Sequence, residues 1–262
     1  MKQKYVSKYL THFAGQDKSN NEAQFQVLLD ILGSGQLRSE MHQDNMHAYT
    51  TINPTAKVSK NEMHNIDMVC FCDIPLKHSG IHIKKYSSFG LSFNKRFIVS
   101  KGGVPVLYIP QKAAMLNQRI TKSEYFDNII PHYYKLFHLL IYNAEVREVL
   151  KAKYTAPPDV VNCPQFASPP YSDCQMDFVE LLDKLYDLLE FHLLCSLQFY
   201  DHTLRDNHPK NYYLEREWRI LGKLKFTSRN VRRIIAPLKY QERLLKAFPQ
   251  YKQKLKAPPP SA

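Results

Sequence analysis

Residues 68–76 read Met68-Val69-Cys70-Phe71-Cys72-Asp73-Ile74-Pro75-Leu76, and this stretch decides how the rest of the chain is interpreted. Its first five residues form a compact run of apolar, aromatic and thiol side chains, which is typical of a buried strand. Asp and Pro then end the run, because Pro cannot donate a hydrogen bond to a neighbouring strand. We therefore expect a strand over 68–72 and a helical stretch after it that ends near Tyr86.

Strand patterns also occur on both sides of this segment, near the two ends of the chain. A short strand is expected at 50–52, inside an otherwise polar loop over 41–66. Five further segments show alternation or a compact apolar run: residues 9–13, 89–93, 104–109, 217–221 and 231–237. The predicted fold class is therefore α+β, with a mixed sheet built from the N-terminal and C-terminal parts.

Apolar residues at helical spacing predict four longer helices. Asn21 is the expected cap of the first helix, which Gly33 and Gly35 end. The others are expected over 123–153, 177–201 and 238–255. The two middle helices are expected to pack as a hairpin. This pattern predicts an α+β core over 1–110 and 211–256, and a helical insertion over 111–210 with a Pro-rich loop at 155–175.

The 262 residues carry a formal net charge of +12, and nearly all of it lies near the C-terminus. Residues 216–256 hold 13 Lys and Arg against two acidic residues. Such asymmetry fits a solvated basic face, contact with nucleic acid, or contact with an acidic protein partner. The candidate contact residues for a nucleic acid or a partner are Arg229, Arg232, Arg233, Lys239 and Arg243.

Several classes of protein and site are not expected. No apolar run is long enough to cross a bilayer, and the N-terminus has no signal-peptide core, so no membrane contact is expected. Five Cys at wide spacings suggest reduced thiols in the cytoplasm. Cys70 and Cys72 lack the two-residue gap common in zinc sites, although both should point to one face of their strand, and no metal is expected. Neither a Walker loop nor a dinucleotide-binding glycine pattern occurs.

Glu215-Arg216-Glu217-Trp218-Arg219 places acids at the start of a strand whose other face is apolar. One interpretation is an acid paired with Arg219 or with Arg96. The other is a carboxylate that holds a ribose hydroxyl and stabilises the cation formed when an N-glycosidic bond breaks. Catalysis needs the Glu217 carboxylate to face an open cleft, whereas a binding protein can bury it in an ion pair.

Together these segments resemble the AbiGi family of bacterial abortive-infection proteins. The resemblance covers roughly 1–110 and 211–237, and its most specific string is Val69 to Leu76. Residues 5–13, 86–93 with Lys95, 105–108 and 215–219 also resemble that family. Membership implies a role in phage resistance within a toxin–antitoxin type of system, with a cognate toxin or antitoxin as partner.

The order of motifs also resembles the ADP-ribosyltransferases built around His, Tyr and Glu. This resemblance implies NAD as substrate, with His12, Tyr86 and Glu217 as catalytic residues. It places His12, Phe13, Tyr86 and Ser88 at the NAD site, and Phe13 stands where that branch usually has Gly.

Two functions therefore remain open at this point. One is an enzyme that cleaves NAD and transfers ADP-ribose to an anionic or protein target, or to water. The alternative is a non-catalytic antitoxin or regulator that binds a partner toxin or nucleic acid through the basic C-terminal segment.

Overall fold

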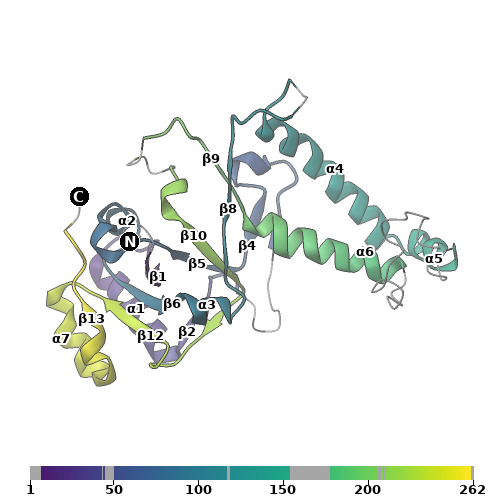
Figure 1. The fold of residues 1–262 in the computed structure, drawn as a ribbon. Coiled ribbons are helices and arrows are strands. Elements are labelled where there is room, and N and C mark those ends of the chain that lie inside the picture. Colours follow the sequence, from purple (N-terminus) through teal and green to yellow (C-terminus); the bar gives the residue numbers. More distant parts are fainter. Residues whose placement is uncertain are drawn as a thin grey trace, which may run out of the picture.

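The computed structural model describes residues 7–42, 44, 50–116, 119–153, 178–205, 208 and 210–260. Its centre is a seven-stranded sheet of order β13-β12-β6-β1-β5-β10-β7 (Figure 1). Neighbouring strands run antiparallel except β12 and β13, which are parallel, so the sheet is mixed. The strands are β1 (Tyr9–Phe13), β5 (Met68–Cys72), β6 (Gly90–Asn94), β7 (Val104–Pro105), β10 (Glu217–Leu221), β12 (Val231–Ile235) and β13 (Leu255–Lys256). The expected α+β class and a sheet drawn from both ends of the chain are confirmed.

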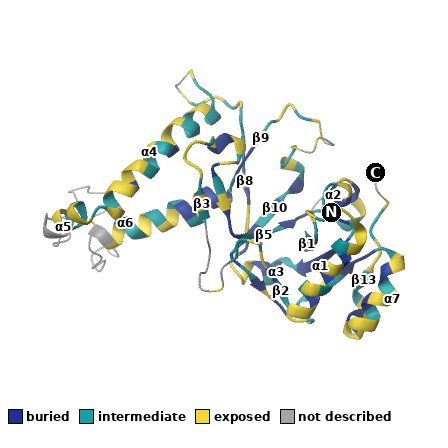
Figure 2. Cartoon of the chain, turned by 180° about the vertical axis from the view of Figure 1, so that it is seen from behind, coloured by how far each residue is buried: buried dark blue, intermediate teal, exposed yellow. Residues whose placement is uncertain are grey.

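One face of this sheet carries the main hydrophobic core. Leu10, Phe71, Leu91 and Phe93 point from the strands into it and are almost completely buried. Helices α1 (Asn21–Ser34) and α7 (Leu238–Ala247) supply the opposing apolar side chains, and both present exposed outer faces in Figure 2. This is the pairing expected of amphipathic helices on a sheet.

The N-terminal cap of the first helix lies one residue earlier than expected. The side chain of Asn20, not Asn21, accepts a hydrogen bond from the Ala23 N–H, while Asn21 is already helical. Gly35 ends the helix at φ 65°, a left-handed conformation that favours glycine.

The opposite face of the sheet is covered by a smaller cluster. Phe13, Cys72 and Ile235 on the strands pack against Ile83 of α2 (Gly80–Lys85). Helix α2 follows a short 3-10 turn at Leu76–His78, so the expected helical stretch before Tyr86 is confirmed.

Three small sheets join other parts of the chain. They pair β2 (Gln36–Leu37) with β11 (Leu224–Lys225), β3 (Thr50–Ile52) with β4 (His64–Ile66), and β8 (Leu107–Pro110) with β9 (Leu197–Tyr200). Strand β4, helix α3 (Lys95–Val99) and the 3-10 turn Val58–Lys60 were not predicted. Short elements of this kind carry too few residues for a recognisable period.

The middle of the chain forms helices that project away from the sheet (Figure 1). They are α4 (Lys122–Tyr142), α5 (Ala144–Lys153) and α6 (Phe178–Asp187). Thr121 and Glu124 form a capping box at the start of α4. Helix α6 packs on α4 and α5, as expected of a hairpin. The predicted Pro-rich loop at 155–175 lies outside the described residues, and the domain boundaries stay a prediction.

Several predicted elements are wrong in their extent. The helix expected over 123–153 is two helices, because Asn143 takes an extended conformation between α4 and α5. The strand expected over 104–109 is two strands, because β7 pairs with β10 whereas β8 pairs with β9. The helix expected to reach residue 201 ends at Asp187; a π-helical turn (188–193) and a 3-10 turn (194–196) follow, and 197–200 join β8 instead. The terminal helix ends at Ala247, before Pro249 begins a 3-10 segment.

Candidate functional site

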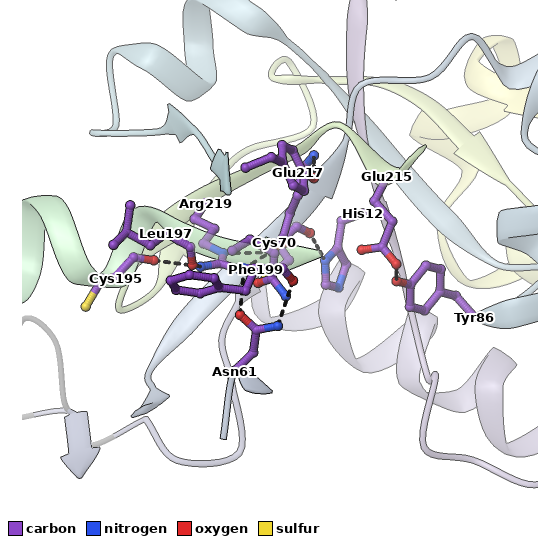
Figure 3. Close-up of polar contacts among 12 residues, drawn as sticks. His12, Asn61, Cys70, Tyr86, Cys195, Leu197, Phe199, Glu215, Glu217 and Arg219 are labelled. Atoms are coloured by element: carbon purple, nitrogen blue, oxygen red, sulfur yellow. Dashed lines mark hydrogen bonds and ion pairs between the residues drawn. The ribbon is translucent and has the colours of Figure 1, made fainter. Parts of the chain in front are cut away.

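Glu217 begins β10, and Arg219 lies two residues further along the same strand. Residues two apart on a strand share a face, so their side chains lie next to each other. Arg219 donates from Nε to Oε1 of Glu217 at 3.0 Å and from Nη2 to Oε2 at 3.1 Å (Figure 3). The two residues are only 8% and 6% exposed. The interpretation of Glu217 as an acid paired with Arg219 is therefore confirmed.

The same guanidinium also ties β10 to the segment around β9. Its Nη1 donates to the carbonyl oxygens of Cys195 at 2.7 Å and Leu197 at 3.2 Å, and its Nη2 donates to the side chain of Gln198. Counting the two bonds to Glu217, all five N–H groups of Arg219 have acceptors. A buried ion pair offsets its desolvation cost only when its remaining groups are satisfied in this way.

His12 lies on the other face of the sheet from Glu217. Glu217 and Thr11 both pair with Cys72, so Thr11 shares the face of Glu217 and the next residue, His12, faces away. The His12 ring packs edge-on against Phe71 at 5.9 Å and donates from Nδ1 to the Cys70 carbonyl at 2.9 Å. Burial lowers the pKa of His12, which keeps its ring neutral. The structure does not bring His12 and Glu217 together.

Tyr86 and Phe13 do lie on the face of Glu217. Their rings are stacked with centroids 6.2 Å apart. The Tyr86 hydroxyl donates to Glu215, as Figure 3 shows, so the acid it contacts is not Glu217. Burial raises the pKa of Tyr86. Ser88, also assigned to the predicted NAD site, lies half-buried in the loop before β6.

Glu215 is the acid whose role the sequence did not resolve. It is buried, and one carboxylate oxygen accepts hydrogen bonds from both Lys85 and Tyr86. Burial raises the pKa of Glu215, and the bonds from Lys85 and Tyr86 oppose that shift. The Lys85 ammonium also lies over the rings of Tyr86 and Tyr212, at 5.1 and 4.7 Å. Only the spacing of Glu215 and Glu217 in sequence hinted at this second acid.

A cleft of about 580 Å³ lies beside Glu217. Its aromatic lining includes Tyr108, Tyr213 and Trp218. The backbone N–H of Glu217 donates to the Tyr108 hydroxyl at 2.8 Å. The residue thus borders the cleft while its carboxylate oxygens bind Arg219.

The five candidate contact cations have different environments. Arg229, Arg232 and Lys239 are exposed. Arg233 is half-buried, with its guanidinium 4.7 Å from the centre of the Tyr9 ring. Arg243 donates to both oxygens of Glu22, at 2.9 and 2.6 Å. Part of the basic surface is therefore already neutralised within the chain.

The described cysteines are free thiols: Cys70, Cys72 and Cys195. Cys70 and Cys72 pair with Arg219 and Glu217 and so point to one face of β5, as predicted. Burial raises the pKa of all three, to about 12 for Cys195. Within the described ranges, no three His, Cys, Asp or Glu residues gather as metal ligands would, and no helix is both long and apolar enough to span a membrane.

Comparison with known proteins gives one result. Residues 40–256 match the model of a family described as putative abortive phage resistance protein AbiGi, antitoxin. That range includes β5, β10 and the whole helical hairpin. Neither a curated protein nor a solved structure matches the chain. The fold analogy with ADP-ribosyltransferases therefore stays a prediction.

Proposed function

The chain belongs to the AbiGi family of abortive phage resistance proteins, and we propose that it acts as an antitoxin by binding a partner protein. The buried pair of Glu217 and Arg219 is the observation that carries this proposal. Stabilising a developing cation requires a carboxylate whose charge is free to act on the substrate. Here a cation of the protein itself occupies both oxygens, so the pair presents no net charge to a ligand.

The position of His12 supports the same proposal. In the predicted enzyme, His12 and Glu217 hold the two riboses of one NAD molecule. With the sheet between them, one ligand cannot contact both side chains. The hydrogen bond from His12 to Cys70 instead connects β1 and β5 at a point where their pairing is limited to one residue pair.

The exposed cations indicate the chemistry of the partner. Arg229 and Arg232 lie at and just after the turn into β12, and Lys239 lies in the first turn of α7. Exposed charge of one sign accelerates and orients association with a surface of opposite sign. We expect the partner to present acidic residues to these cations.

Cleavage of NAD stays a prediction of the sequence. It requires Arg219 to release Glu217 when NAD binds, which would leave two buried N–H groups of Arg219 without their acceptors. Glu217 and Tyr108 both line one cleft, and a ligand bound in it would lie next to Glu217.

The test is co-expression with the protein encoded beside this gene, scored by growth and by the amount of complex purified. We expect wild type and Glu217→Gln to neutralise the partner equally when their folded amounts are matched. Charge reversal at Arg229 and Arg232 should weaken the complex, and Glu242→Gln, a change at an exposed acid, serves as the control. Loss of neutralisation in folded Glu217→Gln, with Glu242→Gln unaffected, contradicts the proposal.

A further inference from the structure

A groove of about 570 Å³ lies where both ends of the described chain meet the turn before α2. Figures 1 and 2 show the two termini and α2 close together in opposite views. Four cations line this basic groove: Lys8, Lys77, Arg233 and Lys256. None of the described residues that line it is acidic. Arg233 and Lys256 belong to the basic segment 216–256, and only Arg233 was named among the expected contact residues, whereas Lys8 and Lys77 come from distant parts of the chain.

Asp73, an acid bonded to a residue that lines the basic groove, is already neutralised. Asp73 accepts a hydrogen bond from the backbone N–H of Ser7, which lines the groove, at 3.1 Å. Its other oxygen accepts from Lys95 at 2.6 Å. Asp73 therefore does not neutralise the four cations. Their positive charge can attract an anionic ligand into the groove.

Packing restricts the Arg233 side chain before any anionic ligand binds. It pairs with Ser92 across β12 and β6, and its guanidinium lies over the Tyr9 ring. Packing of this kind limits the freedom of the side chain, so less entropy is lost when it binds. The charge on this edge of the sheet extends to Lys254, whose pKa is lowered by burial and then by Arg232.

The remaining lining favours a peptide over a nucleic-acid backbone. Pro75, Leu76 and Pro259 give the groove an apolar part, which suits side chains and not phosphates. Strand β13 forms the adjacent sheet edge, but it has only two residues and is followed by Pro258. Because Pro blocks the ladder, a ligand is not expected to extend the sheet, and recognition falls to the groove.

We propose that the basic groove binds an acidic segment of a protein partner, with Lys8, Lys77, Arg233 and Lys256 pairing with its carboxylates. This inference rests on the proposed function, since it names the chemistry by which the partner is recognised. Exposed lysines act here as point charges, so the interaction weakens as salt is added.

The test uses the full chain and a fluorescein-labelled peptide in which Glu alternates with Leu and Gly, with binding followed by fluorescence anisotropy. We expect the double variant Lys77→Glu, Lys256→Glu to lower affinity by about tenfold or more. The control is Lys101→Glu, Lys246→Glu, which makes the same change in net charge at exposed lysines outside the groove and should lower affinity less than about twofold. Replacing Glu by Gln in the peptide should abolish binding.

Equal losses in the two double variants would show a response to net charge alone and would overturn the inference. So would tighter, groove-dependent binding of fluorescein-labelled oligothymidine, which would identify the ligand as a phosphate backbone. If the Lys77→Glu, Lys256→Glu variant neutralises the partner at the wild-type level, the groove is not the binding site for the partner. The proposed function is unaffected by that result. Groove-dependent peptide binding by a chain that neutralises nothing refutes the proposed function instead.

Discussion

Arg219 binds both carboxylate oxygens of Glu217, which lies two residues before it on β10, at 3.0 and 3.1 Å. The pair is buried, and the guanidinium continues to the carbonyl groups of Cys195 and Leu197. These bonds connect the central sheet to the segment that leads out of the helical hairpin. We conclude that the motif from Glu215 to Arg219 holds the two parts of the fold together.

This role predicts a large loss of stability when the cation is removed. Arg219→Met leaves the Glu217 carboxylate buried without a partner, and we expect the free energy of unfolding to fall by about 3–5 kcal/mol. Urea unfolding followed by circular dichroism measures it. Glu242→Gln, at an exposed acid, should change the free energy by less than about 0.5 kcal/mol.

A double variant separates the pair from the rest of the network. Glu217→Leu combined with Arg219→Met removes both charges, so its cost should be smaller than the sum of the two single costs. Additive costs would mean that the two side chains do not stabilise each other.

Asn61 gives a second stability prediction, at the contact between the 58–60 turn and β9. Its side chain donates to the Phe199 carbonyl at 2.9 Å and accepts from the Phe199 N–H at 2.8 Å, while its backbone has φ 59°. Asn61→Ala loses both bonds and keeps a strained backbone, so we expect a loss of about 2–4 kcal/mol. Asn61→Gly also loses both bonds, but glycine adopts this positive φ without strain. It should therefore be about 1 kcal/mol more stable than Asn61→Ala.

Two histidines predict how stability depends on pH. Burial lowers the pKa of His64 and of His82 to about 4, from an ordinary value of 6.5. The unfolded chain therefore takes up these protons first, and stability should fall as pH decreases from 6.5 towards 4. His64→Gln and His82→Gln should each make this fall shallower in urea titrations, whereas His78→Gln, at an exposed position, should not.

Glu190 predicts the opposite dependence. It lies buried in the π-helical turn after α6, where the Tyr134 hydroxyl donates to Oε2 at 2.6 Å, and its Oε1 has no hydrogen-bond partner among the described residues. Burial raises its pKa above the ordinary 4.5, so the folded chain gives up this proton later than the unfolded chain. The contribution of Glu190 to the free energy of unfolding therefore falls as pH rises through its folded pKa.

Glu190→Gln removes this titration. Relative to wild type, the variant should gain stability as pH rises above the ordinary Glu pKa of 4.5, measured as the difference in unfolding free energy. Glu62→Gln, at an exposed acid, should show no such change. A difference for Glu190→Gln that stays constant as pH rises above 4.5 would contradict the assignment.

The sequence predicted the elements of the central sheet well and the connections less well. Residues 9–13, 68–72 and 217–221 form strands as expected, because their apolar patterns reflect burial in one sheet. The end of the 177–201 helix could not be predicted, since residues 197–200 leave the helical pattern only because β8 is available to pair with them. Pairing of that kind is a tertiary effect that local pattern does not contain.

The candidate site was predictable in its residues but not in its geometry. The pairing of Glu217 with Arg219 follows from their spacing on one strand, and was one of two interpretations. The face on which His12 lies depends on the register of β1 against β5, segments about 58 residues apart. A shift of one residue would exchange the faces, and no local pattern sets that register.

The most direct test of the account is cellular NAD and growth when this chain is expressed alone and together with the protein encoded beside its gene. We predict steady NAD and normal growth for the chain alone, and restored growth of the co-expressing cells with both wild type and Glu217→Gln. Loss of NAD with wild type alone, absent in a folded Glu217→Gln variant, would contradict the account and identify an enzyme.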